Sequence, residues 1–168
     1  MYRIARLILA ASLLAGIVAA PVAARTPGPT IVETAIAVNA TTGEFDSLIA
    51  AVVRADLADL LSGNRQFTVF APTDAAFEDL FETLGVAGVQ DIPVATLRAV
   101  LLYHVAPGER FSADVLGATR IRTISKGFLA PAVIDGLPFV NGARILIPDV
   151  DASNGVIHVI DQVLLPAG

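Results

Sequence analysis

The 168-residue sequence contains no cysteine. A chain without cysteine has no disulfide bonds, no thiolate metal site and no cysteine for an N-terminal lipid anchor. Charged residues are also scarce, at 16% against about a quarter in average proteins. Because 55% of the residues are hydrophobic, a disordered, solvating polypeptide is excluded. The chain is therefore expected to fold as a single domain that packing alone stabilises.

Residue sets that carry catalysis are also lacking. No serine stands in a Gly-x-Ser-x-Gly elbow, and the chain has only two histidines. His104 falls on the apolar stripe of an expected helix, and His158 lies inside the apolar run VIHVI. Histidines in such places are more often core residues with both ring nitrogens engaged than general bases. No catalytic residue is therefore expected, and an exported hydrolase is kept as an alternative.

Metal ligands are not spaced for a site. The two histidines stand far apart in the sequence without cysteines, which argues against zinc. Asp149, Asp151 and Ser153 alternate as in a calcium loop, but Asn154 stands where glycine is required and Ile160 where glutamate is required. We therefore expect no metal and no cofactor, and interpret this segment as a polar hairpin loop in which Asn154 and the following glycine form the turn.

The N-terminus has the pattern of an export signal. Arg3 and Arg6 precede an apolar run over residues 7–20, and a small residue, Ala24, ends the segment that follows. This pattern predicts a secretory signal peptide over residues 1–24. The run is shorter than the about 20 residues of a membrane-spanning helix, so an uncleaved anchor is the alternative. The expected location is the periplasm or the extracellular space.

The remainder of the chain is acidic. Removing residues 1–24 takes away two of the 11 basic residues and none of the 16 acidic ones, which leaves a formal net charge of −7. Nucleic acid and anionic lipid are therefore not expected as partners, nor is stable membrane insertion after cleavage. Residues 25–30, with two prolines and a glycine, suit a short linker, and residues 31–168 are expected to form the folded domain.

Helices are expected in the first half of the domain and strands in the second. Apolar residues recur at helical spacing in four stretches, which begin at Glu44, after Asp56, after Pro72 and at Pro93, the last ending at Tyr103. Asp56 is a possible N-cap of the second helix. Strand patterns cover residues 66–71, 119–124, 128–134, 137–140, 143–147 and 156–160, and Asn141-Gly142 is a strong hairpin signal. The order predicts an α+β fold in which antiparallel sheets pack against a helical layer.

The stretch FTVFAPTDAAF runs from a strand directly into a helix. A strand that ends in a polar residue at a helix start can present a nucleophile, but this corner offers a threonine in place of a serine. Thr73 or Asp74 can accept hydrogen bonds from the free amides of the first helical turn. The sequence therefore favours a structural corner whose polar atoms cap a helix.

Three separated motifs resemble those of the fasciclin (FAS1) family. They are FTVFAPTDAAF, LLYHVAPGE and SNGVIHVIDQVLLP, and they occur in the family's order. The resemblance covers about residues 30–166 and implies the FAS1 fold, a β-sandwich or wedge with a packed layer of short helices. It also implies a secreted, non-catalytic module for cell adhesion or for binding a protein or polysaccharide at the cell surface or in the matrix. A carrier of a small apolar ligand in a helix–sheet cleft is the alternative function.

The resemblance also assigns roles to individual residues. Tyr103 and His104 match a Tyr-His motif of the family. In animal members this motif is implicated in integrin binding. Asp149 and Val150 stand where those members have Asp-Ile after a proline, so Val150 departs from their pattern. These four are the candidate partner-binding residues. The candidate fold-defining residues are Thr73, Asp74, Phe77, Asn154, Gly155, His158 and Asp161.

Overall fold

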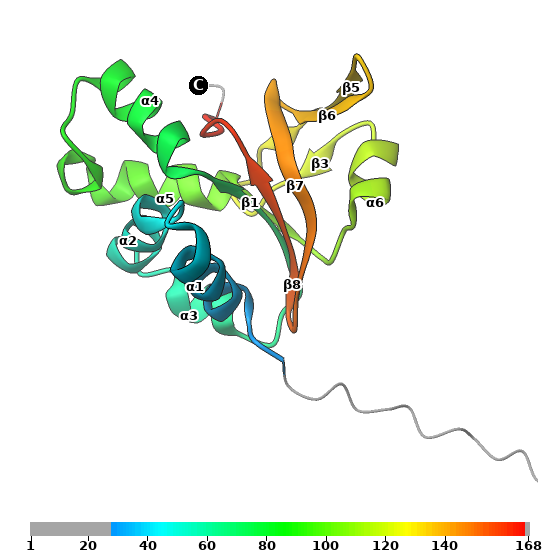
Figure 1. Cartoon of the computed structure of the whole chain (residues 1–168), viewed down its shortest axis with the longest axis horizontal. Helices are drawn as coiled ribbons and strands as arrows, with labels where there is room; N and C mark the ends of the chain where they lie inside the picture. Colours follow the sequence, from blue (N-terminus) through cyan, green and yellow to red (C-terminus); the bar gives the residue numbers. More distant parts are fainter. Residues whose placement is uncertain (1–27, 167–168) are drawn as a thin grey trace, which may run out of the picture.

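The computed structural model describes residues 28–166 (Figure 1). The expected signal peptide and linker residues 25–27 lie outside this range. Most helices gather on one side of the main sheet, and one short helix lies with the small strands on the other, so the α+β class is confirmed. The helices are α1 (Ile31–Thr42), α2 (Asp46–Arg54), α3 (Ala58–Ser62), α4 (Asp74–Leu84), the 3₁₀ turn η1 (Val89–Asp91), α5 (Val94–Tyr103) and α6 (Ser112–Gly117).

The main sheet has six strands in the order β2-β1-β8-β7-β6-β5. Strand β1 pairs in parallel with β8, from Phe67 opposite Gly155 to Pro72 opposite Ile160. The sheet is therefore mixed, where only antiparallel pairing was expected. The strands are β1 (Phe67–Pro72), β2 (Val105–Pro107), β5 (Pro131–Ile134), β6 (Leu137–Val140), β7 (Ala143–Ala152) and β8 (Gly155–Ile160), and β3 (Ile121–Arg122) and β4 (Phe128–Leu129) form a separate pair.

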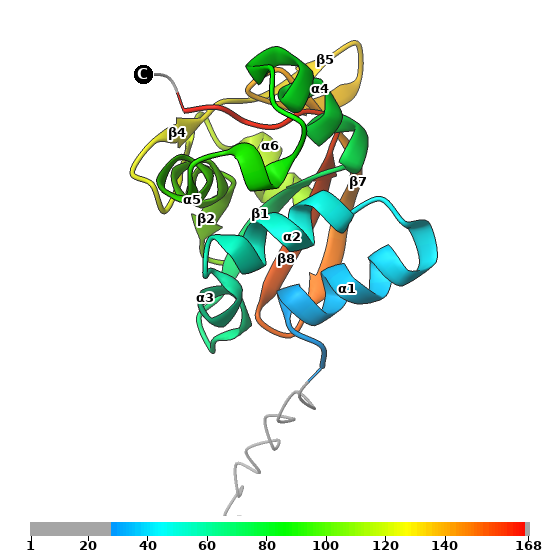
Figure 2. The same ribbon diagram turned by 90° about the vertical axis from the view of Figure 1, so that its left-hand side faces the viewer.

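Two hydrophobic cores lie on opposite faces of the sheet. Helices α1 to α5 cover one face, and α6 with β3 and β4 lies on the other (Figures 1 and 2). On β1, Val69 contributes to the core under the helices, and Phe70 contributes to the core on the opposite face. Every residue of β1 and β8 is buried for this reason. Burial on both faces explains why these strands read as continuous apolar runs.

Helix α1 was not expected from the sequence. Its first turn is closed by a capping box, in which Thr30 accepts a hydrogen bond from the Glu33 N–H and the Glu33 carboxylate accepts one of 2.8 Å from the Thr30 N–H. The hydrogen bonds that the Thr30 N–H and the Thr30 hydroxyl donate to the Glu33 carboxylate lower the pKa of Glu33. The helix shows no clear amphipathic stripe, because Ile36 stands on its exposed side. The Thr-x-x-Glu spacing was the available signal.

Two expectations about turns have different outcomes. Asn141 and Gly142 take φ values of 49° and 86° and join β6 to β7, which confirms the predicted hairpin. Asp56 does not cap α3, since it has a φ of 55° in the turn before the helix and the N-cap residue is Leu57. The expected cap was wrong because the chain needs a left-handed residue to turn between α2 and α3, and aspartate tolerates that conformation.

The segment expected as a polar loop before β8 belongs largely to a strand. Strand β7 continues to Ala152, with irregular register between Ile147 and Val150, and Ala152 pairs with Gly155. The turn therefore consists of Ser153 and Asn154. The predicted strand over residues 128–134 also divides into β4 and β5. Short elements at residues 89–91, 105–107 and 112–117 were not expected.

Candidate functional site

The strand-to-helix corner uses its polar atoms to cap two helices. The Thr73 hydroxyl accepts a hydrogen bond from the Ala76 N–H at 3.4 Å and caps α4. The Asp74 carboxylate instead accepts bonds from the N–H groups of Ser47 at 2.7 Å and Asp46 at 3.1 Å, at the start of α2. Phe77, one turn into α4, is buried in the helix-side core. These contacts attach the corner to the starts of α2 and α4, and the fold-defining role of the three residues stays a prediction.

His104 is buried and uses both ring nitrogens. Its Nδ1 lies 2.8 Å from the Val100 carbonyl oxygen, and its Nε2 accepts a hydrogen bond of 2.8 Å from the Leu164 N–H. Because a carbonyl can only accept, Nδ1 carries the proton and the ring is neutral. Burial lowers the pKa of His104 to about 4, although the bond to Val100 opposes this effect. The ring therefore joins the end of α5 to the C-terminal segment.

His158 is buried in the centre of β8 and is also fully engaged. Its Nε2 lies 2.9 Å from the Arg110 carbonyl oxygen, and its Nδ1 accepts a hydrogen bond of 3.2 Å from the Asp149 N–H. The ring stacks on Phe70, with 5.5 Å between centroids. Burial lowers the pKa of His158, against the bond to Arg110 and the nearby Asp149 carboxylate. This histidine connects β8 to both the bulge of β7 and the loop before α6.

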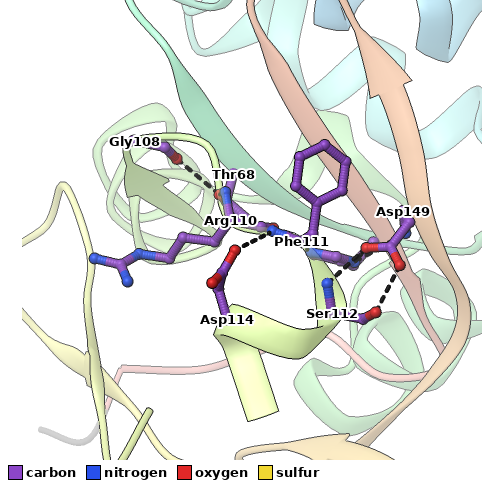
Figure 3. A network of polar contacts seen from close by, with 8 residues as sticks. Thr68, Gly108, Arg110, Phe111, Ser112, Asp114 and Asp149 are labelled. Atoms are coloured by element: carbon purple, nitrogen blue, oxygen red, sulfur yellow. Dashed lines mark hydrogen bonds and ion pairs between the residues drawn. The ribbon is translucent and has the colours of Figure 1, made fainter. Parts of the chain in front are cut away.

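Asp149 holds the first turn of α6 (Figure 3). Its carboxylate accepts hydrogen bonds from the N–H of Ser112 at 2.6 Å and from the Ser112 hydroxyl at 2.5 Å. The residue takes a φ of 60° in the irregular part of β7, which directs its side chain towards α6. Both carboxylate oxygens of this candidate partner-binding residue are therefore engaged within the domain. Val150, its neighbour, is half-buried and packs on the helix-side core.

Serine, aspartate and histidine come together here, but not in a hydrolytic arrangement. The Ser112 hydroxyl donates to Asp149, whereas a nucleophilic serine would donate to histidine. The Asp149 carboxylate is 4.0 Å from Nδ1 of His158, and that nitrogen already accepts the Asp149 N–H. These bonds instead attach the segment before and at the start of α6 to strands β7 and β8.

The same loop is attached to β1 through Thr68. The Thr68 hydroxyl donates to the Gly108 carbonyl at 2.7 Å and accepts a hydrogen bond from the Arg110 N–H at 2.9 Å (Figure 3). With the bonds to His158 and Asp149, the segment from 108 to 112 is held at several points along its length. Sequence reasoning missed Thr68 and Ser112, because their partners lie on segments about 40 residues away in the sequence.

Tyr103 is buried, and its hydroxyl joins the start of β4 to the turn between β6 and β7. The hydroxyl donates to the Phe128 carbonyl at 2.8 Å and accepts a hydrogen bond of 2.8 Å from the Asn141 side-chain amide. Gly127 packs directly on the ring, since an added Cβ would lie 2.5 Å from it. Tyr103 and His104, the candidate partner-binding pair, therefore have their polar atoms inside the domain.

Asn154 joins three elements from the turn between β7 and β8. Its Oδ1 accepts a hydrogen bond of 2.8 Å from the Ile31 N–H, and its Nδ2 donates to the carbonyls of Leu61 at 2.7 Å and Gly63 at 2.9 Å. The next residue, Gly155, has a φ of 152°, and a Cβ there would lie 1.9 Å from the Phe67 carbonyl oxygen.

Asp161 closes the other end of β8. Its carboxylate accepts a hydrogen bond of 2.8 Å from the Arg144 N–H, and its own N–H donates to the Arg144 carbonyl at 3.1 Å. Asp161 therefore fixes the end of β8 against β7. These contacts agree with a fold-defining role for the residue.

An apolar cleft of about 70 Å³ lies between α1, α2 and the sheet. All of its lining residues are hydrophobic, including the exposed Ile36 and Val53 at its rim. Ligand pockets for small molecules usually enclose about 300 Å³ or more. The cleft as it stands therefore accommodates one apolar side chain better than a whole lipid.

Metal sites and membrane spans are not found in the described part of the chain. Across residues 28–166, no three histidine, aspartate or glutamate side chains come together in a way that could hold a metal ion. Within the same residues, no helix combines the length and hydrophobicity needed to cross a membrane.

The fold and the buried motifs together define the class of domain. It is a mixed sheet whose helical layer and loops are attached through residues of the corner, Tyr-His and C-terminal motifs. The family model described as Fasciclin domain matches residues 43–166. The chain therefore belongs to the fasciclin family. The FAS1 fold expected from the sequence is confirmed.

Known proteins with similar sequence or structure agree with this assignment. The chain is 45% identical over 137 residues to Protein sll1483 of Synechocystis sp., covering 79% of this chain and 73% of that protein. It is 31% identical over 124 residues to periostin of Homo sapiens, covering 73% of this chain and 15% of periostin. A FAS1 domain pair from the insect cell adhesion molecule Fasciclin I matches with a TM-score of 0.68 at 19% identity, covering 83% of this chain and 51% of that chain. The structural match concerns the fold.

Proposed function

We propose that this protein is an exported, non-catalytic interaction module that binds a protein or polysaccharide at the cell surface or in the extracellular matrix. The observation that carries the proposal is the use of the motif side chains. The rings of His104 and His158 and the hydroxyl of Tyr103 all bind groups within the domain. With these groups engaged, the outer surface of a rigid scaffold is left to act on other molecules.

Exposed apolar side chains on the sheet support this proposal. Several large hydrophobic residues on β5, β6 and β7 are 38% to 59% exposed, namely Val133, Ile134, Leu137, Leu146 and Ile147. Neighbouring exposed apolar residues on a folded domain often mark an interaction site. Relatedness to Fasciclin I, an insect cell adhesion molecule, and the N-terminal export pattern are consistent with such a site outside the cell.

In this proposal, the four candidate partner-binding residues act by shaping the surface. Tyr103 holds the start of β4 and the turn at Asn141 in place, and Asp149 holds α6. Replacing them would weaken partner binding through displacement of these surface segments. The half-buried Val150 contributes through packing in the same way.

The proposal is tested by measuring binding of the labelled purified protein to envelope and matrix fractions of its own cells. Saturable binding is expected, and prior treatment of the fractions with protease or with glycosidases separates a protein partner from a polysaccharide. As a chemical control, turnover of ester and glycoside substrates is assayed in parallel. Absence of saturable binding, or turnover that disappears in a folded His104→Ala variant, would contradict the proposal.

A carrier of a small apolar ligand is the second candidate, because the cleft beside α1 is lined only by hydrophobic residues. The cleft volume requires α1 to move before a lipid could enter. A thermal-shift screen against lipids and quinones tests this function, since a ligand that binds the folded state raises the melting temperature in a dose-dependent manner. A Val53→Lys variant, which adds a charge at the rim of the cleft, should abolish any such shift.

A further inference from the structure

Strand β5 is an edge of the six-stranded sheet. The other edge, β2, is covered because its Val105 carbonyl accepts a hydrogen bond of 2.8 Å from the Ile124 N–H. Helix α6 packs against part of β5, but no strand pairs with β5 on the side away from β6, and the Val133 side chain is 59% exposed. An open edge presents backbone groups that can pair with another strand.

The backbone groups that face this open edge can be identified from the ladder. The Asn141 N–H donates to the Ala130 carbonyl at 2.9 Å, and Ile134 pairs with Leu137 at the other end of the hairpin. In an antiparallel ladder, alternate residues bond to the same neighbour. The even-numbered residues of β5 therefore face β6. The N–H and C=O of Val133, the C=O of Pro131 and the N–H of Asp135 face away from it.

The stretch of chain that forms this edge is largely apolar and has almost no net charge. Between residues 128 and 148 the only charged residues are Asp135 and Arg144, of opposite sign. By parity in the ladder, Ile134 and Leu137 share one face beside the edge, and both are exposed. The rest of the domain carries the acidic excess, so two copies would repel each other least when they meet here.

We infer that β5 is a self-association site, at which β5 of a second copy pairs antiparallel about Val133. In this register, each Val133 N–H donates to the Val133 carbonyl of the other copy, and each Asp135 N–H donates to the other copy's Pro131 carbonyl. The missing N–H of Pro131 falls at the end of the shared ladder, where Asp135 turns away with a φ of 52°. The two Asp135 carboxylates lie at opposite ends, so like charges do not face each other.

Two-fold symmetry makes such a surface complementary to itself. The exposed Ile134 and Leu137 of both copies would form a continuous apolar face across the shared sheet. A small interface of this kind is of the weak, transient class. Because it names one partner for the proposed interaction module, the inference rests on that function.

The position of the edge also determines what the pair would connect. The β5–β6 hairpin lies at one end of the molecule, and the N-terminal end of the described chain lies at the opposite end (Figures 1 and 2). Pairing through β5 therefore places the two N-terminal ends far apart, on opposite sides of the dimer.

Sedimentation equilibrium of the full-length protein as recovered from its expressing cells tests the inference. A concentration-dependent dimer is expected. Val133→Lys brings two like charges together at the two-fold axis, and Val133→Pro removes an N–H that β6 does not use. Each should weaken dimerisation by at least about tenfold, while Val53→Lys, an exposed valine on α2, should leave it unchanged.

A cross-linking experiment tests the register. Since the chain has no cysteine, Val133→Cys introduces a single thiol. Directly opposed hydrogen-bonded residues have Cα atoms about 5.5 Å apart, within disulfide range. Oxidation should yield a covalent dimer for Val133→Cys and none for Val53→Cys.

A protein that stays monomeric, or a dimer that survives in folded Val133→Lys and Val133→Pro variants, would overturn the inference. A dimer in which Val133→Cys does not cross-link would overturn the register. A monomer that still binds envelope fractions would refute self-association alone. A dimer that binds neither envelope nor matrix would refute the proposed function instead.

Discussion

The side chain of Asn154 accepts a hydrogen bond from the backbone N–H of Ile31, although the two residues are 123 positions apart. The same side chain donates to two carbonyls at the end of α3. One amide in a strand turn thus holds the start of α1 and the end of α3 against the sheet. The contacts of this family motif therefore lie inside the domain.

Replacement of Asn154 with alanine should lower the free energy of unfolding by about 2 to 4 kcal/mol, because three backbone groups lose their partner, two of them through buried bonds. Urea denaturation monitored by circular dichroism measures the change. Replacement of the exposed Asn64 with alanine is the matched control and should have little effect. Equal stabilities for the two variants would show that water replaces the lost bonds.

Replacement of His104 with alanine should lower the free energy of unfolding by roughly 1 to 3 kcal/mol, since the Leu164 N–H is left buried without its acceptor. His158→Ala should act similarly through the loop before α6. Gln162→Ala, an exposed change on the same C-terminal segment as Leu164, should stay within about 0.5 kcal/mol of the unmutated protein. Unchanged melting temperatures for both histidine variants would contradict the expectation.

Stability should fall as the pH decreases from about 6.5 to about 4. The pKa of His104 is about 4 in the folded protein and about 6.5 when unfolded, so the unfolded state binds a proton first. Stability is fully present above pH 6.5 and is lost through this range, by roughly 3 kcal/mol for His104 at about 1.4 kcal/mol per pH unit. Urea midpoints at pH 7, 5.5 and 4 should converge between the protein and His104→Gln. Parallel pH profiles would disprove this origin.

Replacement of Asp149 with alanine should lower the free energy of unfolding by about 1 to 2 kcal/mol. The first turn of α6 loses the two hydrogen bonds that Ser112 donates to the carboxylate, and alanine tolerates the positive φ poorly. Asp149→Asn should lose less, since asparagine keeps an acceptor and tolerates the backbone conformation. Hydrogen exchange of the α6 amides measures the local effect. Faster exchange elsewhere but not in α6 would argue against this role.

Replacement of Gly155 with alanine should lower the free energy of unfolding by more than about 3 kcal/mol or prevent folding, because the added Cβ would overlap the Phe67 carbonyl. Gly117→Ala is the matched control, because the space around Gly117 is open, and it should be neutral or slightly stabilising. Thermal melts of the two variants give the comparison. Similar melting temperatures would require β1 and β8 to separate without cost.

Local patterns predicted much of the architecture. The apolar residues of α2, α4 and α5 repeat every three to four positions, and Asn141-Gly142 could form a turn that needs positive φ at both positions. These elements could therefore be predicted from residues close together in the sequence. Helix α1 was missed because exposed Ile36 blurs its stripe. The parallel pairing of β1 with β8 was missed because the alternation of a strand does not indicate which strand lies beside it.

The sequence indicated the burial of some candidate residues but not the contacts of their side chains. Burial of His104 and His158 followed from their apolar neighbours in the sequence. The partners of Asp74 and Asp149 are backbone groups of α2 and α6, and a backbone N–H leaves no signature in the amino-acid pattern. The candidate partner-binding residues were therefore chosen without knowledge that three of the four form hydrogen bonds inside the domain through their side chains.

The place of β8 between β1 and β7 has a consequence for biogenesis. Strand β8 is the last strand to be synthesised, and its residues lie almost 90 positions after the β1 residues with which they pair. Pairing between such distant segments forms slowly. Neither of the two hydrophobic cores can therefore close until β8 has been synthesised as far as residue 160. For the proposed export, a domain that closes only with its last strand stays unfolded for longer, and an unfolded chain is the state that a narrow translocation channel accepts.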